Sequence, residues 1–166
     1  MKDVAGFFDD PVVEVEGHRY SLDAFERHFL FADFDRRGDA PPPAQLDTRV
    51  HFAIVCAARG CPPLATSPYR ASTLDADLDA AARDALLSPF HLRADQRTLR
   101  YSISSIFDWY AKDFGGRAGV IEFLKRYAPE NAAGQIADRG ERALAGFIPW
   151  DWKLNQSGAG ARGEEP

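Results

Sequence analysis

The most apolar run of the chain is DTRVHFAIVCAARGCPPL, at positions 47–64. Within this run, residues Val50–Cys56 are almost all apolar and are rich in Val, Ile and Phe. A short apolar run of this kind is typical of a strand that is covered on both faces. We therefore predict that Val50–Cys56 is the central strand of a sheet, and that residues 57–68 form a loop at its end.

Apolar residues recur three and four positions apart in other segments, which predicts amphipathic helices. These segments are 22–30, 74–86, 106–114 and 117–127. Ser21 is a suitable N-cap for the first of them, because its hydroxyl can accept a free N–H of the first turn. A weaker helix is expected over 131–145, where Gly134 and Gly140 interrupt the pattern.

Two stretches alternate apolar and polar residues and predict hairpins. The first is 12–20, which alternates around Glu16-Gly17 and predicts a small hairpin or two short strands. The second is 91–102, a hairpin that turns at Asp95-Gln96. Residues 148–155 are expected to be extended. Together these elements predict an α+β fold, with four or five helices packed on a small, mostly antiparallel sheet that has Val50–Cys56 at its centre.

The length of 166 residues suits one domain, which we place at residues 1–155. The connector 31–46 contains three consecutive prolines and is expected to be irregular. Residues 156–166 are polar and rich in glycine, and we predict a disordered tail. The hydrophobic fraction of 45% argues against disorder of the chain as a whole.

The net charge of −5 argues against nucleic acid as a partner, because phosphate binding needs clustered Lys and Arg. We expect no membrane span, because no apolar run approaches the roughly 20 residues that a spanning helix needs. The first ten residues, MKDVAGFFDD, lack the apolar core of a signal peptide. This favours a cytoplasmic location for the sequence as it stands, and an exported one if a signal segment precedes it.

Cys56 and Cys61 are the only cysteines in the chain. They can form a single disulfide bridge, remain as two reduced structural thiols, or provide one reactive thiol with a neighbour. A C-x4-C loop closes a bridge if its Cα atoms come within about 7 Å. A metal site that adds His51 and His91 is disfavoured, since this spacing exceeds the common zinc pattern. We therefore expect no metal.

Four pieces of the sequence match one family in order. They are SLDAFE at 21–26, DTRVHFAIVCAARGCPPL at 47–64, SISSIFDWYAKDF at 102–114 and WDWKLN at 150–155. On these residues the chain resembles the domain of unknown function 547 family, over about residues 4–155. The resemblance implies no known activity, because the family is itself uncharacterised.

The chain departs from the family pattern in two ways. Family members carry an upstream helical segment with Trp-Ile-Asn and Tyr-Asn signatures, so we expect that this chain lacks that segment. Surface left open by its absence would favour self-association. The family also has a histidine where this chain has Arg27, and His28 lies one residue later. A shift of one residue turns a helical side chain by roughly 100°.

A thiol nucleophile is one hypothesis for the chemistry of this sequence. Cys61 would be the nucleophile, His51 its base and Asp151 the group that orients the imidazole. Arg59 lies two residues from Cys61 and would favour a thiolate. Against this hypothesis, Pro62 and Pro63 have no N–H to offer an oxyanion. An extended strand would also hold His51 roughly 20 Å from the loop.

The aromatic residues suggest a second function class, in which the domain binds a ligand. Trp109, Tyr110 and Trp152 are candidate binding residues together with Arg59, although aromatic residues at such spacing more often belong to a core. Asp151 between two tryptophans needs a partner, for which Arg49 and Arg59 are the candidates.

We favour a domain that binds a peptide or small molecule near residues 56–64. The alternative is a cysteine-dependent hydrolase or acyl transferase that uses Cys61. No dinucleotide-binding, P-loop or nucleophile-elbow motif occurs in the sequence, so we expect no cofactor.

Overall fold

The structure is a computed structural model of the chain, and it describes residues 6, 8–29 and 46–155. The predicted connector (except Leu46) and the predicted tail lie outside the described residues, as does the side chain of His28. The N-terminal part holds β1 (Val13–Val15), β2 (His18–Tyr20) and α1 (Leu22–Phe29). The remaining elements are η1 (Thr48–Phe52), α2 (Leu74–Leu87), β3 (Leu92–Asp95), β4 (Arg100–Ser104), α3 (Ile106–Trp109), α4 (Gly116–Tyr127), α5 (Glu130–Arg139), η2 (Gly140–Ala143) and β5 (Leu144–Ile148).

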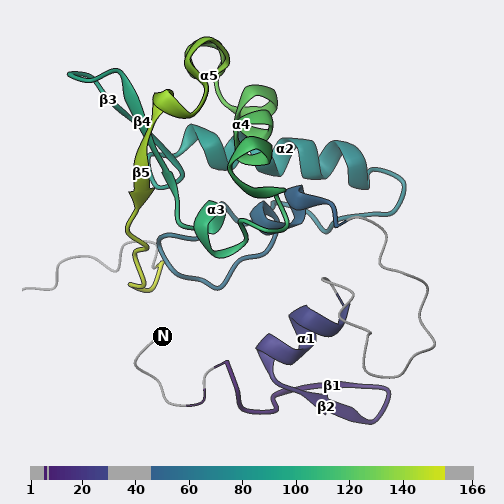
Figure 1. Ribbon diagram of the computed structural model, residues 1–166. Helices are drawn as coiled ribbons and strands as arrows, with labels where there is room; N and C mark the ends of the chain where they lie inside the picture. Colours follow the sequence, from purple (N-terminus) through teal and green to yellow (C-terminus); the bar gives the residue numbers. More distant parts are fainter. Residues whose placement is uncertain (1–5, 7, 30–45, 156–166) are drawn as a thin grey trace, which may run out of the picture.

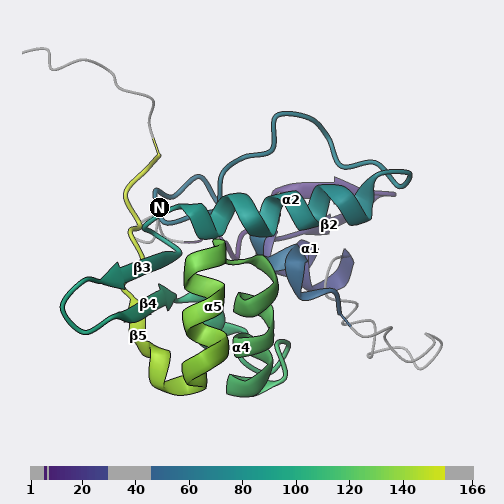
Figure 2. The same cartoon turned by 90° about the horizontal axis from the view of Figure 1, so that it is seen from above.

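These elements confirm the predicted α+β fold (Figure 1). The main sheet has the order β3-β4-β5, in which β3 pairs antiparallel and β5 pairs parallel with β4. Helices α2, α4 and α5 lie beside this sheet in the view from above (Figure 2), and buried residues of all three share one core with β4 and β5. The hairpin β1-β2 forms a separate two-stranded sheet, and Glu16 and Gly17 turn it with positive φ, as predicted.

The prediction that Val50–Cys56 is the central strand of the sheet is wrong. Residues 48–52 form the 3-10 helix η1, and β4 is the central strand instead. The cause lies at Asp47, whose carboxylate accepts the Arg49 N–H at 3.1 Å and caps the first turn. The Arg49 side chain then binds Asp79 of α2 at 2.6 Å, so η1 is fixed against α2. These polar contacts override the strand preference of the β-branched residues.

Two helix predictions also need correction. The helix predicted over 106–114 is regular only over Ile106–Trp109, and turns continue to Phe114. The helix predicted over 131–145 ends at Arg139, because Gly140 adopts a positive φ of 54°. The next apolar residues form β5, which the sequence pattern did not reveal.

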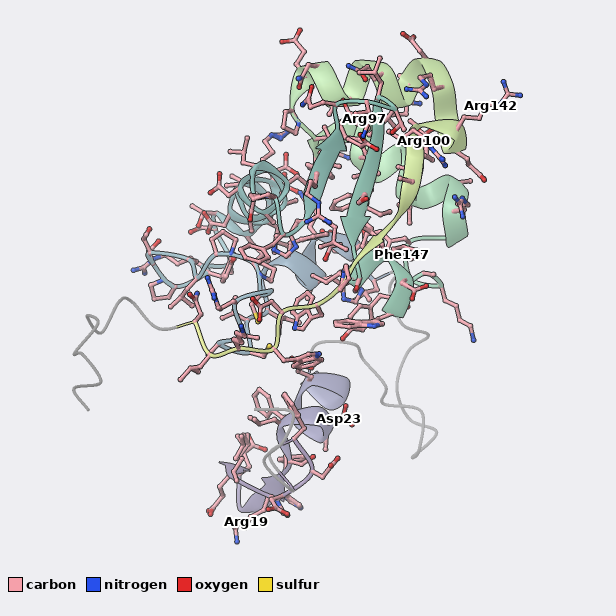
Figure 3. All side chains as sticks on the ribbon, turned by 90° about the vertical axis from the view of Figure 1, so that its left-hand side faces the viewer. Arg19, Asp23, Arg97, Arg100, Arg142 and Phe147 are labelled. Carbon is pink, nitrogen blue, oxygen red and sulfur yellow. The ribbon has the colours of Figure 1, made fainter. Side chains whose placement is uncertain are left out.

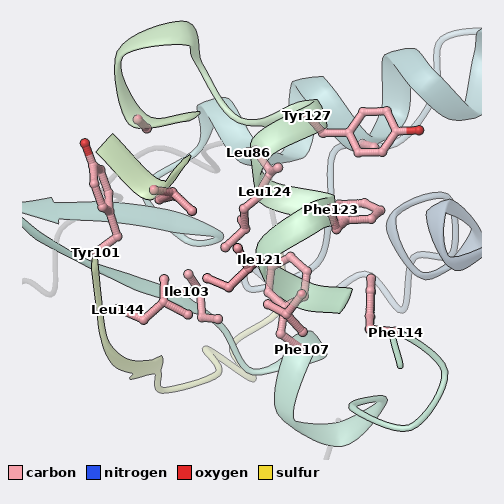
Figure 4. Packing of buried hydrophobic residues seen from close by; sticks show 14 of the residues in the cluster. Leu86, Tyr101, Ile103, Phe107, Phe114, Ile121, Phe123, Leu124, Tyr127 and Leu144 are labelled. Carbon is pink, nitrogen blue, oxygen red and sulfur yellow. The ribbon is translucent and has the colours of Figure 1, made fainter. Parts of the chain in front are cut away.

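Aromatic side chains dominate the core. Phe52 is fully buried, and its ring lies 5.3 Å from that of Phe123 and 5.4 Å from that of Phe107. Figure 4 shows Phe107, Phe114 and Phe123 grouped beside Ile103 of the sheet. The run 47–64 therefore does contribute to the core, as its apolar composition predicts, but it does so from a 3-10 helix.

The N-terminal unit β1-β2-α1 lies beneath the main body in Figure 1, on the side of α3 and of residues 54–62. Figure 3 shows Asp23 of α1 on this side, whereas Arg97 and Arg100 lie at the opposite end of the molecule. The chain that follows β5 returns to the same lower side and pairs with residues 57–60. This lower side is where the candidate site is found.

Candidate functional site

A cavity of about 500 Å³ lies between α1, α3 and the loop that carries the two cysteines. We call it the cysteine cavity. Its wall consists of Phe8, Asp23, Glu26, His51, Ile54, Cys56, Cys61, Pro62, Ile106, Trp109, Tyr110, Trp150 and Trp152. A second hollow of about 580 Å³ adjoins it and shares both cysteines, Glu26 and Pro62. The cysteines therefore border open space on two sides, which suits a site rather than a packed core.

Residues 56–61, which we call the cysteine loop, fold back so that the two thiols meet. Ala57 adopts a left-handed φ of 58°, which reverses the chain directly after Cys56. This conformation costs a residue with a Cβ roughly 1–2 kcal/mol. The N–H of Cys61 then donates to the carbonyl of Ala58 at 3.0 Å. The local turn explains why two cysteines five residues apart face each other.

The C-terminal segment holds the cysteine loop in place. The N–H groups of Arg59 and Gly60 donate to the carbonyls of Lys153 and Asp151, at 2.8 and 2.9 Å. In return, the N–H of Asn155 donates to the carbonyl of Ala57 at 2.8 Å. At Gly60, an added Cβ would lie 3.0 Å from both the Asp151 nitrogen and the Trp150 ring, which is closer than most Cβ contacts, so this close approach favours glycine.

The two thiols form one coupled acid–base pair. Their sulfur atoms are 2.7 Å apart, and the N–H of Cys56 donates to the sulfur of Cys61 at 3.1 Å. The hydrogen bond from Cys61 lowers the pKa of Cys56 to about 6, with the N–H of Ala58 in support. The same hydrogen bond and burial raise the pKa of Cys61. Because the two sulfur atoms lie so close together, a charge on one opposes ionisation of the other, so the reduced pair carries at most one negative charge near neutral pH.

His51 reaches the cavity because its segment is not extended. Its Nε2 lies 3.0 Å from a carboxylate oxygen of Asp113, and its ring stacks on Tyr110 with centroids 4.0 Å apart. Only 4% of the residue is exposed. Burial lowers the pKa of His51, and Asp113 opposes this shift. Asp113, a residue that the sequence reasoning missed, is therefore the carboxylate that orients this imidazole.

Asp151 does not contact the imidazole in the described structure. One of its carboxylate oxygens accepts the N–H of Lys153 at 3.0 Å, and the other lies 4.0 Å from Nε of Arg59. Of the two partners considered for Asp151, Arg59 is the nearby one, and its side chain is half-exposed. Neither Asp151 nor Arg59 is part of the cavity wall.

Three tryptophans lie close together in the wall of the cysteine cavity. The ring centroids of Trp109 and Trp150 are 4.9 Å apart, and each lies 6.1 Å from Trp152. Trp109 is 50% exposed, so this group presents aromatic surface to solvent. These are all the tryptophans in the chain. The predicted binding residues Trp109, Tyr110 and Trp152 thus share the cavity with Cys61 and His51.

The wall also contains groups that the sequence reasoning did not single out. Asp23 and Glu26 of α1 face the cavity, and the charge of Glu26 acts to raise the pKa of Cys56. Both residues belong to the SLDAFE piece, which was their only signal in the sequence. Among the residues that the structure describes, the wall includes no Lys or Arg.

Behind the cysteine loop lies a second buried histidine. His91 is fully buried, and its Nδ1 lies 3.2 Å from the hydroxyl of Ser104. Burial lowers the pKa of His91, and the backbone of Cys61 opposes this shift. Its ring also makes an edge contact with Trp150 at 6.4 Å. Nothing in the sequence pattern of its hairpin predicted this position.

Metal ligands do not gather in the part of the chain that the structure describes. No three side chains among His, Cys, Asp and Glu converge there. The described helices are each too short or too polar to cross a membrane.

The four sequence pieces that carry the family resemblance come together at the cysteine cavity. Apart from Phe8, every residue of its wall lies in 21–26, 47–64, 102–114 or 150–155. A family model described as a protein of unknown function, DUF547, matches residues 1–86. Searches of curated proteins and of solved structures gave no match. Because the family model covers just over half of the 166 residues, the chain belongs to the DUF547 family.

Proposed function

We propose that the cysteine cavity binds a peptide or small molecule that carries a cationic group. The observation that supports this most strongly is the composition of the wall, which joins three tryptophans and a tyrosine to two carboxylates. Aromatic faces attract cations through their quadrupole, and desolvation strengthens the attraction to about 2 kcal/mol. A volume of about 500 Å³ is in the usual range of small-molecule sites.

The charge of the wall also favours a cation over an anion. Asp23 and Glu26 contribute carboxylates, and the cysteine pair adds a thiolate near neutral pH. An anionic ligand would therefore meet like charge when it entered the cavity, whereas an amine or guanidinium group would meet opposite charge.

Tryptophan emission provides a direct assay, because all three tryptophans line the cavity. Benzyltrimethylammonium, which combines a ring with a fixed positive charge, should give a saturable change in emission. Benzoate should bind at least about tenfold more weakly, since a difference of 1.4 kcal/mol suffices for that factor. Absence of saturation with the cation, or equal binding of the two probes, would argue against the proposal.

A carboxylate variant tests the same proposal at one residue. Glu26→Gln removes one negative charge from the wall and should weaken the cationic probe severalfold while leaving benzoate unchanged or tighter. Asp108→Asn is the matched control. Asp108 lies in the same short helix as Trp109, but it borders a different hollow of about 230 Å³. Its removal should leave the affinity for the cation unchanged.

A thiol hydrolase that uses Cys61 is the second candidate, and one observation favours it. His51 carries a carboxylate partner, Asp113, and shares the cavity with Cys61. Two contacts argue against a thiol hydrolase. The Cys61 sulfur contacts Cys56 rather than an imidazole in the described structure, and the Cys61 N–H already donates to Ala58. Pro62 and Pro63 have no N–H, so the residues directly after Cys61 offer no donors to an oxyanion. Ligand binding is therefore the better supported function.

A further inference from the structure

The two sulfur atoms of the cysteine loop lie closer together than a site that only binds a ligand would need. The sulfur atoms of Cys56 and Cys61 are 2.7 Å apart, whereas a formed disulfide has an S–S bond of about 2.05 Å. Both cysteines are half-buried rather than enclosed. They border the cysteine cavity on one side and the adjoining hollow on the other, so a reagent can reach them from open space.

We propose that Cys56 and Cys61 are a thiol–disulfide exchange site, which reduces disulfides that carry cationic groups and becomes an intraloop disulfide in return. The proposed substrate class rests on the cationic ligand inferred above. The exchange itself does not, because it rests on the placement of the two sulfurs.

The exchange proceeds in two steps. The thiolate of Cys56 attacks one sulfur of a disulfide R–S–S–R, which forms a mixed disulfide with Cys56 and releases R–S⁻. Cys61 then loses its proton to solvent and attacks the Cys56 sulfur, which closes the Cys56–Cys61 bond and releases the second R–S⁻. The two thiols supply two electrons, and the two protons that they lose neutralise the two released thiolates.

The loop assigns different roles to the two cysteines. Cys56 is proposed as the attacking sulfur, since hydrogen bonds from the Cys61 thiol and the Ala58 N–H lower its pKa to about 6, and Cys61 lies 2.7 Å away, in place to close the bridge. A thiolate is the attacking species in exchange, so Cys56 acts first. The pKa of Cys61 is raised, so Cys61 stays protonated beside Cys56. It then attacks the mixed disulfide and releases the second thiol. Pro62 and Pro63 follow Cys61 directly and restrict the backbone at the end of the loop.

The carboxylates of the wall set the preferred substrate. Asp23 and Glu26 border the same cavity as both sulfurs. A disulfide flanked by amines is attracted there, and a disulfide flanked by carboxylates is repelled. Cystamine and 3,3′-dithiodipropionate are matched probes for this difference, because they are of similar length and carry opposite charges.

The first measurement uses the full chain in buffers that contain cystamine and cysteamine at graded ratios. After an acid quench, the intact mass should fall by two hydrogens as the ratio rises, and should return when cysteamine is in excess. The proposal is overturned if both thiols persist in cystamine alone, if mixed disulfides accumulate without closing, or if the bridge resists every ratio. These outcomes concern exchange and do not depend on tryptophan emission.

Single variants test which cysteine attacks the substrate and which one closes the bridge. Cys61→Ser should accumulate the mixed disulfide with cystamine, and its rate should level off above about pH 7, as expected for a thiolate that is already formed. The serine hydroxyl can still donate to the Cys56 sulfur. Cys56→Ser should react severalfold more slowly at pH 7, with a rate that still rises above pH 8. Identical pH profiles for the two variants would contradict the assigned order.

A separate measurement tests the preference for disulfides that carry cationic groups. The wild-type chain should react severalfold faster with cystamine than with dithiodipropionate at low ionic strength, and added salt should reduce the difference. Closure with both probes at equal rates would remove the cationic substrate class and would count against the proposed ligand. It would leave exchange at the cysteine loop intact.

Discussion

Single residues determine how this site responds to pH. His51 and His91 are both buried, with 4% and 0% of their surface exposed, and burial lowers the pKa of each. The unfolded chain, by contrast, protonates its histidines near pH 6.5. Each imidazole touches part of the site, since His51 stacks on Tyr110 and His91 makes an edge contact with Trp150. Proton uptake at either residue would therefore disturb the cavity wall.

We expect the free energy of unfolding to fall as the pH drops below about 6.5. In that range the unfolded chain binds more protons than the folded chain, so stability increases with pH. Each unit by which a folded pKa lies below 6.5 costs about 1.4 kcal/mol once the pH falls beneath both values. Urea unfolding at pH 7.5, 6.5, 5.5 and 5.0 measures the effect.

One variant tests the contribution of His91, and a second serves as its control. His91→Gln should reduce the slope of stability against pH, whatever its effect on stability at pH 7.5. His18→Ala is the control for replacement of a histidine outside the site, since His18 is exposed on β2. Stability that is constant or increases as the pH falls from 7.5 to 5.0 would contradict the account.

At the level of elements, the site depends on the pairing of the cysteine loop with residues 151–155. The sequence pattern predicted both hairpins, the N-cap at Ser21, and the long helices α2 and α4, because each has a regular local period. It failed at Val50–Cys56, where Asp47 and Arg49 bind locally and across to α2. It also missed β5, which pairs with β4 across about forty residues. Such contacts leave no periodic mark in the sequence.

Gly60→Ala tests this pairing. The new methyl group would meet the backbone nitrogen of Asp151 and the ring of Trp150, both at 3.0 Å. We expect a loss of about 1–3 kcal/mol of stability, as for other overpacked sites, together with a change in tryptophan emission. Chemical denaturation with fluorescence detection measures both.

Gly134→Ala is the control for the same substitution. Gly134 lies inside α5, and an added Cβ would meet no atom within 4 Å. Alanine should stabilise this helix by about 0.5–1 kcal/mol. If Gly60→Ala were as stable as the wild type and kept its emission, the close contact between the loop and the C-terminal segment would be disproved.

For the molecule as a whole, the cavity brings together segments that are far apart in the chain. The wall of the cysteine cavity combines residues from α1, the cysteine loop, α3 and the segment after β5. The sequence supplied several of the residue types, since Cys61, His51, Trp109, Tyr110 and Trp152 all proved to border it. It did not supply their arrangement, because the His51–Asp113 pair and the carboxylates of α1 depend on tertiary packing.

A cationic ligand in the cysteine cavity would occupy the space in front of the cysteine pair. The most direct test is the rate at which iodoacetamide alkylates the reduced native chain, with and without benzyltrimethylammonium at the concentration that saturates tryptophan emission. Because the cysteines and tryptophans share one wall, the account predicts that the saturating cation slows alkylation of Cys56 markedly, and that benzoate at the same concentration does not. An alkylation rate that stays unchanged while emission is saturated would contradict it.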